Sequence, residues 1–281
     1  MARLSRTTRL IVALGALALL GALGLGFTLL RPAEEENPWE FLGPGSYDVT
    51  SLAFDPTTPT TLYAATDYGD VYKSEDGGAT WRYLRQSREV RGLEFLLAIA
   101  PTTPTTLYLY GERSVYKSAD GGETWRAVNR GLELGERNWL SALSIDPTNP
   151  RVVFAGTGTG VYKSENGGES WRKIGTRRAY ALSIDPTNPR VVFAGTRNGV
   201  YKSTDGGANW RKAEGYFPAI NALSIDPTNS QVIVAGASNG VYKSTDGGAT
   251  WTRTWTSTGL NSKVWDVFID PANPQVLVAR T

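Results

Sequence analysis

The apolar positions of this chain fall into short runs separated by turn-forming residues, and this pattern recurs along the sequence. The clearest unit predicts strands at 181–184, 191–194 and 200–203, and a fourth strand that begins at Trp210. Asp-Pro and Gly-containing segments separate the runs, as expected for tight turns. The runs are rich in Val, Ile, Tyr and Phe, which favour strands. Each unit therefore predicts a four-stranded antiparallel sheet.

An eight-residue phrase, Ser-x-Asp-Gly-Gly-x-Thr-Trp, follows the third predicted strand and occurs five times. Asn166 replaces the Asp in the third copy, whereas Ser170 and Asn209 replace the Thr in the third and fourth. Successive tryptophans of the phrase are 44, 46, 39 and 41 residues apart. A period near 40 residues with four strands per repeat is typical of the blades of a β-propeller.

We interpret the phrase as a structural turn. Its Ser and Asp oxygens can accept hydrogen bonds from the amides of the turn, and its Gly-Gly pair permits positive φ. A single Asp without a second carboxylate is a poor acid/base site, so these residues are not expected to be catalytic. The residues assigned this structural role are Ser74, Asp76, Trp81, Ser118, Asp120, Trp125, Ser164, Asn166, Trp171, Ser203, Asp205, Trp210, Ser244, Asp246 and Trp251.

The predicted fold is all-β, a propeller with five full blades and a partial sixth. Six first strands are marked by their exits at Asp55-Pro56, Ala100-Pro101, Asp146-Pro147, Asp185-Pro186, Asp226-Pro227 and Asp270-Pro271, but only five copies of the phrase follow. We expect 39–42 to supply the outer strand of the sixth blade, beside inner strands at 264–269 and 276–280. We favour a truncated reading frame over a ring that closes on a three-stranded blade.

The N-terminal region predicts a membrane anchor. Residues 10–30 carry no charge and, as a helix, match the thickness of a bilayer core. Arginines precede this segment and glutamates follow it, so residues 1–9 form a basic cytoplasmic tail, 31–37 an acidic linker and 38–281 an exported propeller. The prediction is a single-pass signal anchor with the propeller on the extracytoplasmic side. A cleaved signal peptide is the alternative.

Composition excludes several functional classes. The chain has no cysteine and no histidine, which excludes disulfides, thiolate metal sites and a Ser-His-Asp triad. Four of the 29 basic residues lie within the first 31 positions, so the remaining chain carries 25 basic against 27 acidic residues. This balance does not indicate a nucleic-acid-binding protein. We expect no cofactor and no metal.

The segment Ser118–Trp125 and the other four copies of the phrase resemble Asp-boxes, also called bacterial-neuraminidase repeats. The longer pattern Val-Tyr-Lys-Ser-x-Asp-Gly-Gly-x-Thr-Trp is most similar to photosystem II stability/assembly factor-like propellers and related exported bacterial repeat proteins. The resemblance covers roughly 38–281. It implies a propeller that binds a protein partner, within a membrane complex, through an arginine-rich patch. Sialidases and xyloglucanase-type glycoside hydrolases also carry the motif.

The candidate binding surface is the rim opposite the phrase, where the loops from fourth to first strands vary between repeats. Its residues are Arg91, Arg137, Trp139, Arg177, Arg178, Tyr180, Tyr216, Phe217, Lys263, Trp265 and Asp266. We read them as a basic, aromatic surface that holds a protein partner. The alternative reading is a solvated rim whose arginine stems cover apolar edges.

The alternative function is a glycoside hydrolase that acts on extracellular glycans. Such an enzyme needs two carboxylates roughly 5–10 Å apart. Glu94 and Asp266 are the only acids that we place near the mouth of the ring, and they belong to non-adjacent blades. An Arg-Ile-Pro element, which sialidases typically carry, does not occur. The sequence therefore favours a scaffold over an enzyme.

Overall fold

We describe a computed structural model of the chain. It describes residues 49–85, 96–111, 114–135, 138–215, 217–255, 263–270 and 273–281. Within these ranges the chain forms strands and turns, and no helix there could cross a membrane. The predicted anchor at 10–30 and the predicted strand at 39–42 lie outside the described residues.

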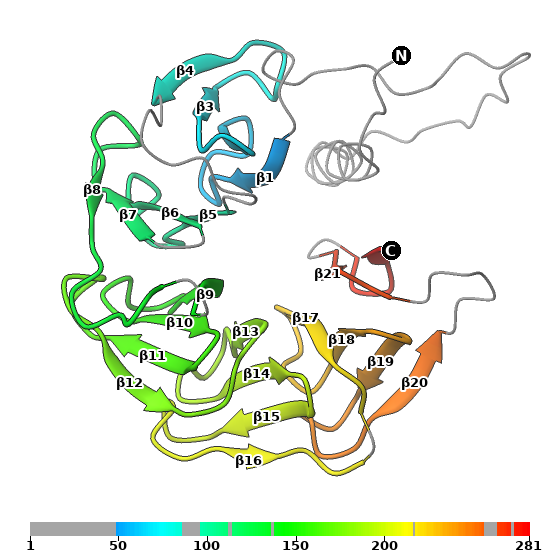
Figure 1. Cartoon of the computed structure of the whole chain (residues 1–281). Helices are drawn as coiled ribbons and strands as arrows, with labels where there is room; N and C mark the ends of the chain where they lie inside the picture. The colour runs from blue at the N-terminus through cyan, green and yellow to red at the C-terminus, as the bar shows by residue number, and fades with distance from the viewer. Residues whose placement is uncertain are drawn as a thin grey trace, which may run out of the picture. The chain divides into compact units, whose positions relative to one another are not determined.

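The strands form five four-stranded sheets and one two-stranded sheet, each in sequence order, which we call blades 1 to 6 (Figure 1). Blade 1 contains β1 Val49–Phe54, β2 Leu62–Thr66, β3 Val71–Ser74 and β4 Arg82–Arg85, and blade 2 contains β5 Leu96–Ile99, β6 Leu107–Gly111, β7 Ser114–Ser118 and β8 Arg126–Ala127. Blade 3 contains β9 Leu140–Ile145, β10 Val153–Thr157, β11 Gly160–Ser164 and β12 Arg172–Gly175.

The later blades follow the same order. Blade 4 contains β13 Ala181–Ile184, β14 Val192–Thr196, β15 Gly199–Ser203 and β16 Arg211–Lys212. Blade 5 contains β17 Ile220–Ile225, β18 Ile233–Ala237, β19 Gly240–Ser244 and β20 Thr252–Trp255, and blade 6 pairs β21 Asp266–Ile269 with β22 Leu277–Arg280. The predicted four strands per repeat and their antiparallel pairing are confirmed. So is the pairing of the last two predicted strands.

The chain divides into two compact units, with the boundary between Leu97 and Ala98. In the second unit, the first strands β9, β13, β17 and β21 lie next to one another, while β12, β16 and β20 form the opposite edges of their sheets (Figure 1). Every residue of the second strands β10, β14 and β18 is buried. Blades that pack face to face bury both sides of a sheet, which explains why these strands are apolar without alternation.

The octapeptide turn of one blade packs against an aromatic ring of the blade before it. A Cβ at Gly248 would lie 2.7 Å from Cε1 of Phe193, and one at Gly207 would lie 3.1 Å from Cε1 of Phe154. These rings are fully or almost fully buried in the second strands of the preceding blades. Only glycine leaves room for the ring at this position.

A lysine of the third strand reinforces the same contact. Lys117 and Lys202 each extend over the ring of their own second strand, Tyr108 and Phe193, at 5.7 and 5.4 Å from the centroid. Their Nζ atoms donate to the carbonyls of Gly167 and Gly247 in the next blade, at 2.9 and 2.7 Å. The Val-Tyr-Lys-Ser segment therefore links adjacent blades as well as forming a strand.

In the second unit the turns fall on two opposite rims, as the antiparallel order predicts. The first glycine of each octapeptide donates its amide to the turn between the first and second strands, as Gly167 does to the Arg151 carbonyl at 2.7 Å. On the other rim, the turn between the second and third strands meets the loop that enters the blade. Gly158 donates to the Trp139 carbonyl there at 3.1 Å.

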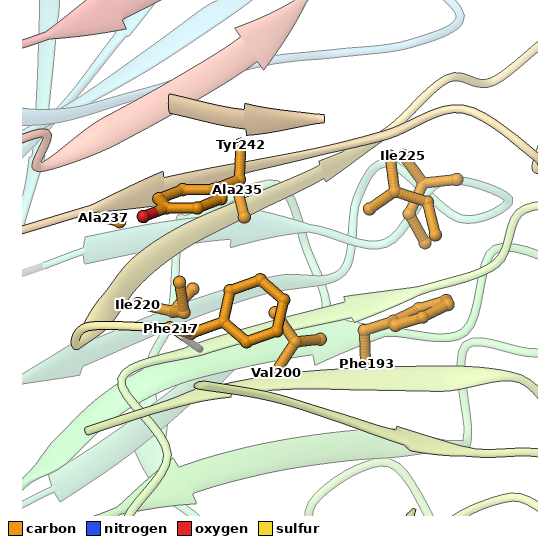
Figure 2. Close-up of a cluster of buried hydrophobic side chains, with 9 residues drawn as sticks. Phe193, Val200, Phe217, Ile220, Ile225, Ala235, Ala237 and Tyr242 are labelled. Atoms are coloured by element: carbon orange, nitrogen blue, oxygen red, sulfur yellow. The ribbon is translucent and has the colours of Figure 1, made fainter. Parts of the chain in front are cut away.

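Phe217 lies in the hydrophobic core, although the sequence placed it on the binding rim. It is 6% exposed and packs against Tyr242 and Trp251 of the next blade, with ring centroids 5.6 and 5.9 Å away. Figure 2 shows it within the cluster that joins blades 4 and 5, near Ile220 and Val200. Burial of this apolar ring stabilises the fold, so Phe217 is buried although it lies in a loop.

Gly248→Ala tests the contact between an octapeptide and the preceding blade. We expect a loss of about 2–4 kcal/mol in the free energy of unfolding, from a strained positive φ and from overpacking against Phe193. Urea denaturation of the purified full chain measures it. Gly135→Ala is the matched control, because a Cβ there meets nothing within 4 Å, and it should cost less than about 0.5 kcal/mol. Equal losses for the two variants would refute the packing argument.

Candidate functional site on the loop rim

The octapeptide turns form closed hydrogen-bond networks. In every copy the Ser hydroxyl donates to the Asp or Asn side chain at 2.7–2.9 Å, and the amide of the second glycine donates to the Ser hydroxyl at 2.8 Å. Both glycines have positive φ in every copy. The Asp or Asn also accepts the amide two residues after the second glycine, at 2.8–3.0 Å. These contacts agree with the structural role that the sequence suggests for the turn.

The same hydrogen bonds lower the pKa of the turn carboxylates. At Asp120 the Thr124 hydroxyl and then the Thr124 amide stabilise the ionised form, and the pKa is lowered to about 2. Asp76 and Asp246 show the same fall to about 2 from the equivalent threonines. For Asp205 the amide and then the side chain of Asn209 have this effect, also to about 2.

On the opposite rim, Arg178 lies between two aromatic rings. Its guanidinium carbon is 4.4 Å from the centroid of Trp139 and 4.6 Å from that of Tyr180, within cation–π range of both. Trp139 precedes β9 of blade 3, whereas Arg178 and Tyr180 precede β13 of blade 4. The Tyr180 amide donates to the Gly195 carbonyl at 2.8 Å, which fixes the loop against its own blade. We call Trp139, Arg178 and Tyr180 the arginine sandwich.

The arginine sandwich is partly open to solvent. Trp139 is 37% exposed, and Arg178 and Tyr180 are half-buried. The Nε of Arg178 is enclosed and has no hydrogen-bond acceptor among the described residues. Aromatic stacking therefore positions the guanidinium without an acid that neutralises it in the described part of the chain.

A second cation–aromatic pair lies at the entry to blade 6. The Lys263 ammonium is 3.2 Å from the centroid of Trp265, whose side chain is 51% exposed. The Trp265 amide donates to the Arg280 carbonyl at 2.8 Å, which ties this segment to β22. Like the arginine sandwich, this pair presents a flat apolar surface next to a positive charge.

Asp266 is ion-paired with Arg280, its direct partner across the β21–β22 hairpin. Burial raises the pKa of the Tyr110 hydroxyl, and the negative charge of Asp266 raises it further. Among the described residues, Asp266 is therefore ion-paired with an arginine and interacts electrostatically with the Tyr110 phenol. Glu94, the second acid considered for glycoside hydrolysis, lies outside the described residues. Sequence reasoning missed Arg280, although the register of the predicted hairpin places it opposite Asp266.

The remaining predicted rim residues lie in different surroundings or outside the described residues. Arg177 extends over the ring of Tyr201, with its guanidinium carbon 5.1 Å from the centroid, and Phe217 is buried as described above. Arg91, Arg137 and Tyr216 lie outside the described residues. Within the described ranges, no group of three Asp or Glu side chains is placed to hold a metal ion.

Comparison with known proteins gives a family. The model of the DUF6242 beta propeller domain matches residues 36–264. No curated protein matches the chain.

Solved structures share the fold at low sequence identity. The GH74 xyloglucanase from Xanthomonas campestris is 21% identical, with a TM-score of 0.67 over 84% of this chain and 42% of its own. An ancestral GH74 enzyme is 23% identical, with a TM-score of 0.69 over 85% of this chain and 35% of its own. The chain therefore spans about a third to two fifths of these two enzymes.

YCF48 from Cyanidioschyzon merolae is closer in length. It is 15% identical, with a TM-score of 0.55 over 85% of this chain and 94% of its own. A second structure, of YCF48 bound to D1 peptide, is 16% identical, with a TM-score of 0.59 over 80% of this chain and 72% of its own. At these identities the likeness shows the fold alone.

Acid titration tests the turn networks. The folded-state pKa of about 2 lies below the ordinary 3.8, so the unfolded chain binds more protons between these values. The contribution of the four carboxylates is complete above about pH 4 and is lost as the pH falls toward 2. We expect the melting temperature of the full chain to fall across this window.

The control replaces all four turn Asp residues by Asn. Asn166 shows that an amide can form this network, because it accepts from the Ser170 amide at 3.0 Å and donates to the Ser170 hydroxyl at 2.9 Å. The fourfold variant should therefore fold at neutral pH and lose less stability than the parent between pH 4 and 2. An acid profile identical to that of the parent would contradict the assigned role of the carboxylates.

Proposed function

The chain belongs to the DUF6242 beta propeller family, and on that premise we propose that it is a membrane-tethered scaffold that binds a protein partner outside the cytoplasm. The binding surface is the loop rim that carries the arginine sandwich and the Lys263–Trp265 pair. We also assign the octapeptides to the Asp-box class, on the strength of their repeated hydrogen-bond pattern.

The observation that carries the proposal is the arginine sandwich. It joins the loops of two adjacent blades and presents a guanidinium held between Trp139 and Tyr180. Protein interfaces concentrate tryptophan, tyrosine and arginine, and such residues dominate their binding energy. Because stacking already fixes the side chains, little conformational entropy is lost when a partner binds.

Two further points support this proposal. The solved YCF48 structure with D1 peptide is of a protein of this fold that holds a peptide. In the described residues Asp266 is ion-paired with Arg280, which disfavours it as one of the two acids that a glycoside hydrolase needs. The membrane tether rests on the uncharged segment at 10–30, with arginines before it and glutamates after it.

Affinity purification of the tagged full chain from its own membranes tests the proposal. We expect membrane-protein subunits to copurify, and Trp139→Ala and Arg178→Ala each to weaken their retention about tenfold, because truncation of a central anchor typically costs 1–2 kcal/mol or more. Arg190→Ala is the control, since this exposed arginine lies in a turn of the opposite rim. Arg91→Ala and Arg137→Ala extend the series to the other predicted arginines.

Two results would overturn the proposal. One is retention of the same partners by the Trp139 and Arg178 variants at the level of the parent. The other is hydrolysis of an aryl glycoside by the purified chain that is lost in Asp266→Asn, which would establish the hydrolase instead.

A further inference from the structure

We call the interface between two adjacent blades a seam. In the second unit the loops fill these seams with different residues, although the repeats are similar. Each seam can be compared at the tyrosine of the third strand, which is Tyr162 in blade 3, Tyr201 in blade 4 and Tyr242 in blade 5. The loop that leaves the preceding blade supplies a different residue to each tyrosine. This difference decides whether the seam is filled.

The seam between blades 2 and 3 is clasped. Trp171 donates its indole Nε1 to the Val128 carbonyl at 2.8 Å and its amide to the Arg130 carbonyl at 2.9 Å. Tyr162 donates its hydroxyl to Glu133 at 3.2 Å. Trp171 is consequently buried at 6% exposure.

The seam between blades 4 and 5 is plugged by an apolar ring. Phe217 packs on both Tyr242 and Trp251 and belongs to the buried cluster in Figure 2. No charged residue is needed there, because the phenyl ring occupies the space beside the tyrosine.

The seam between blades 3 and 4 has neither hydrogen bonds like those of Trp171 nor an apolar ring like Phe217 among the described residues. Trp210, the equivalent of Trp171, has an enclosed indole Nε1 with no acceptor among the described residues. Arg177 takes the place beside Tyr201 that Phe217 takes beside Tyr242. The result is an open groove of about 690 Å³ between β12 and the face of blade 4, with Val161, Ile174, Tyr201 and Trp210 among its walls.

The charged side chains that line this groove are all basic. Arg172 and Arg177 line it, both are exposed, and no acidic side chain is among its lining residues. Neither arginine makes an ion pair with a carboxylate of the described residues. By contrast, Arg126, which occupies the position of Arg172 in blade 2, is neutralised by Glu169 of blade 3 through two hydrogen bonds.

We propose that this groove is a second binding site, separate from the arginine sandwich and the Lys263–Trp265 pair, and that it takes an extended acidic peptide with apolar side chains. The volume is within the range of ligand-binding clefts. Carboxylates of the peptide pair with Arg172 and Arg177, and its apolar side chains cover Ile174 and Trp210. β12 is the outermost strand of its sheet, so an extended segment can also pair with its backbone.

The test measures binding of a fluorescein-labelled peptide of alternating Asp and Val to the purified full chain. The double variant Arg172→Glu with Arg177→Glu should bind at least about tenfold more weakly, because two charge-assisted contacts become repulsive. Arg177→Phe should also abolish binding, since it copies the plug of the neighbouring seam, while the melting temperature is kept or raised. Arg211→Glu is the matched control, because Arg211 is exposed, occupies the same position in blade 4 and lies outside the groove.

A second readout locates the peptide. In a ¹⁵N-indole spectrum, the Trp210 signal is identified by its absence in Trp210→Phe and should shift when the peptide is added. The rim variants Trp139→Ala and Arg178→Ala should leave this binding unchanged, so the two sites can fail independently.

The proposal is overturned by equal peptide binding in the double variant, or by indole shifts that spare Trp210. It is also overturned if a Lys-Val peptide binds as well as the acidic one. Tighter binding of an oligogalacturonate than of the peptide would assign the groove to an acidic glycan instead and would equally refute it.

Discussion

Blade packing in the second unit depends on one close approach, between the second glycine of an octapeptide and the aromatic ring of the preceding blade. The glycine has a positive φ because its amide must reach the Ser hydroxyl of its own turn. The ring must lie against it because the second strand is buried on both faces. The hydrogen bonds within the turn and the packing between blades therefore both require glycine at the same position, the second glycine of the octapeptide.

The repeated geometry of the strands leaves the loops between blades free to differ. The three third-strand tyrosines lie in equivalent positions, yet they meet a carboxylate, a guanidinium and a phenyl ring. The same loops also carry Trp139, Arg178 and Tyr180 to the rim. In this fold, chemical variety is introduced between blades, whereas the strands and octapeptides keep the blades alike.

Much of the fold could be predicted from the sequence, because the repeats state the strand positions several times. Strand order and the two rims follow from the Asp-Pro turns and the octapeptide alone. The burial of Phe217 could not be predicted, because the sequence does not distinguish an exposed aromatic residue in a loop from one that fills a seam between blades. The pairing of Asp266 with Arg280 depended on the hairpin register, and the open groove depended on contacts that Trp210 does not make.

The acceptors of many contacts between blades are backbone carbonyls. Lys117 and Lys202 donate to glycine carbonyls, Ser141 and Asn221 donate to the carbonyls of Ala179 and Val264, and Trp171 donates to that of Val128. A backbone carbonyl is present whatever the side chain, so no substitution at the acceptor removes it. One repeat can therefore change its sequence while its neighbour continues to recognise it, which gives such arrays a tolerance for divergence after duplication.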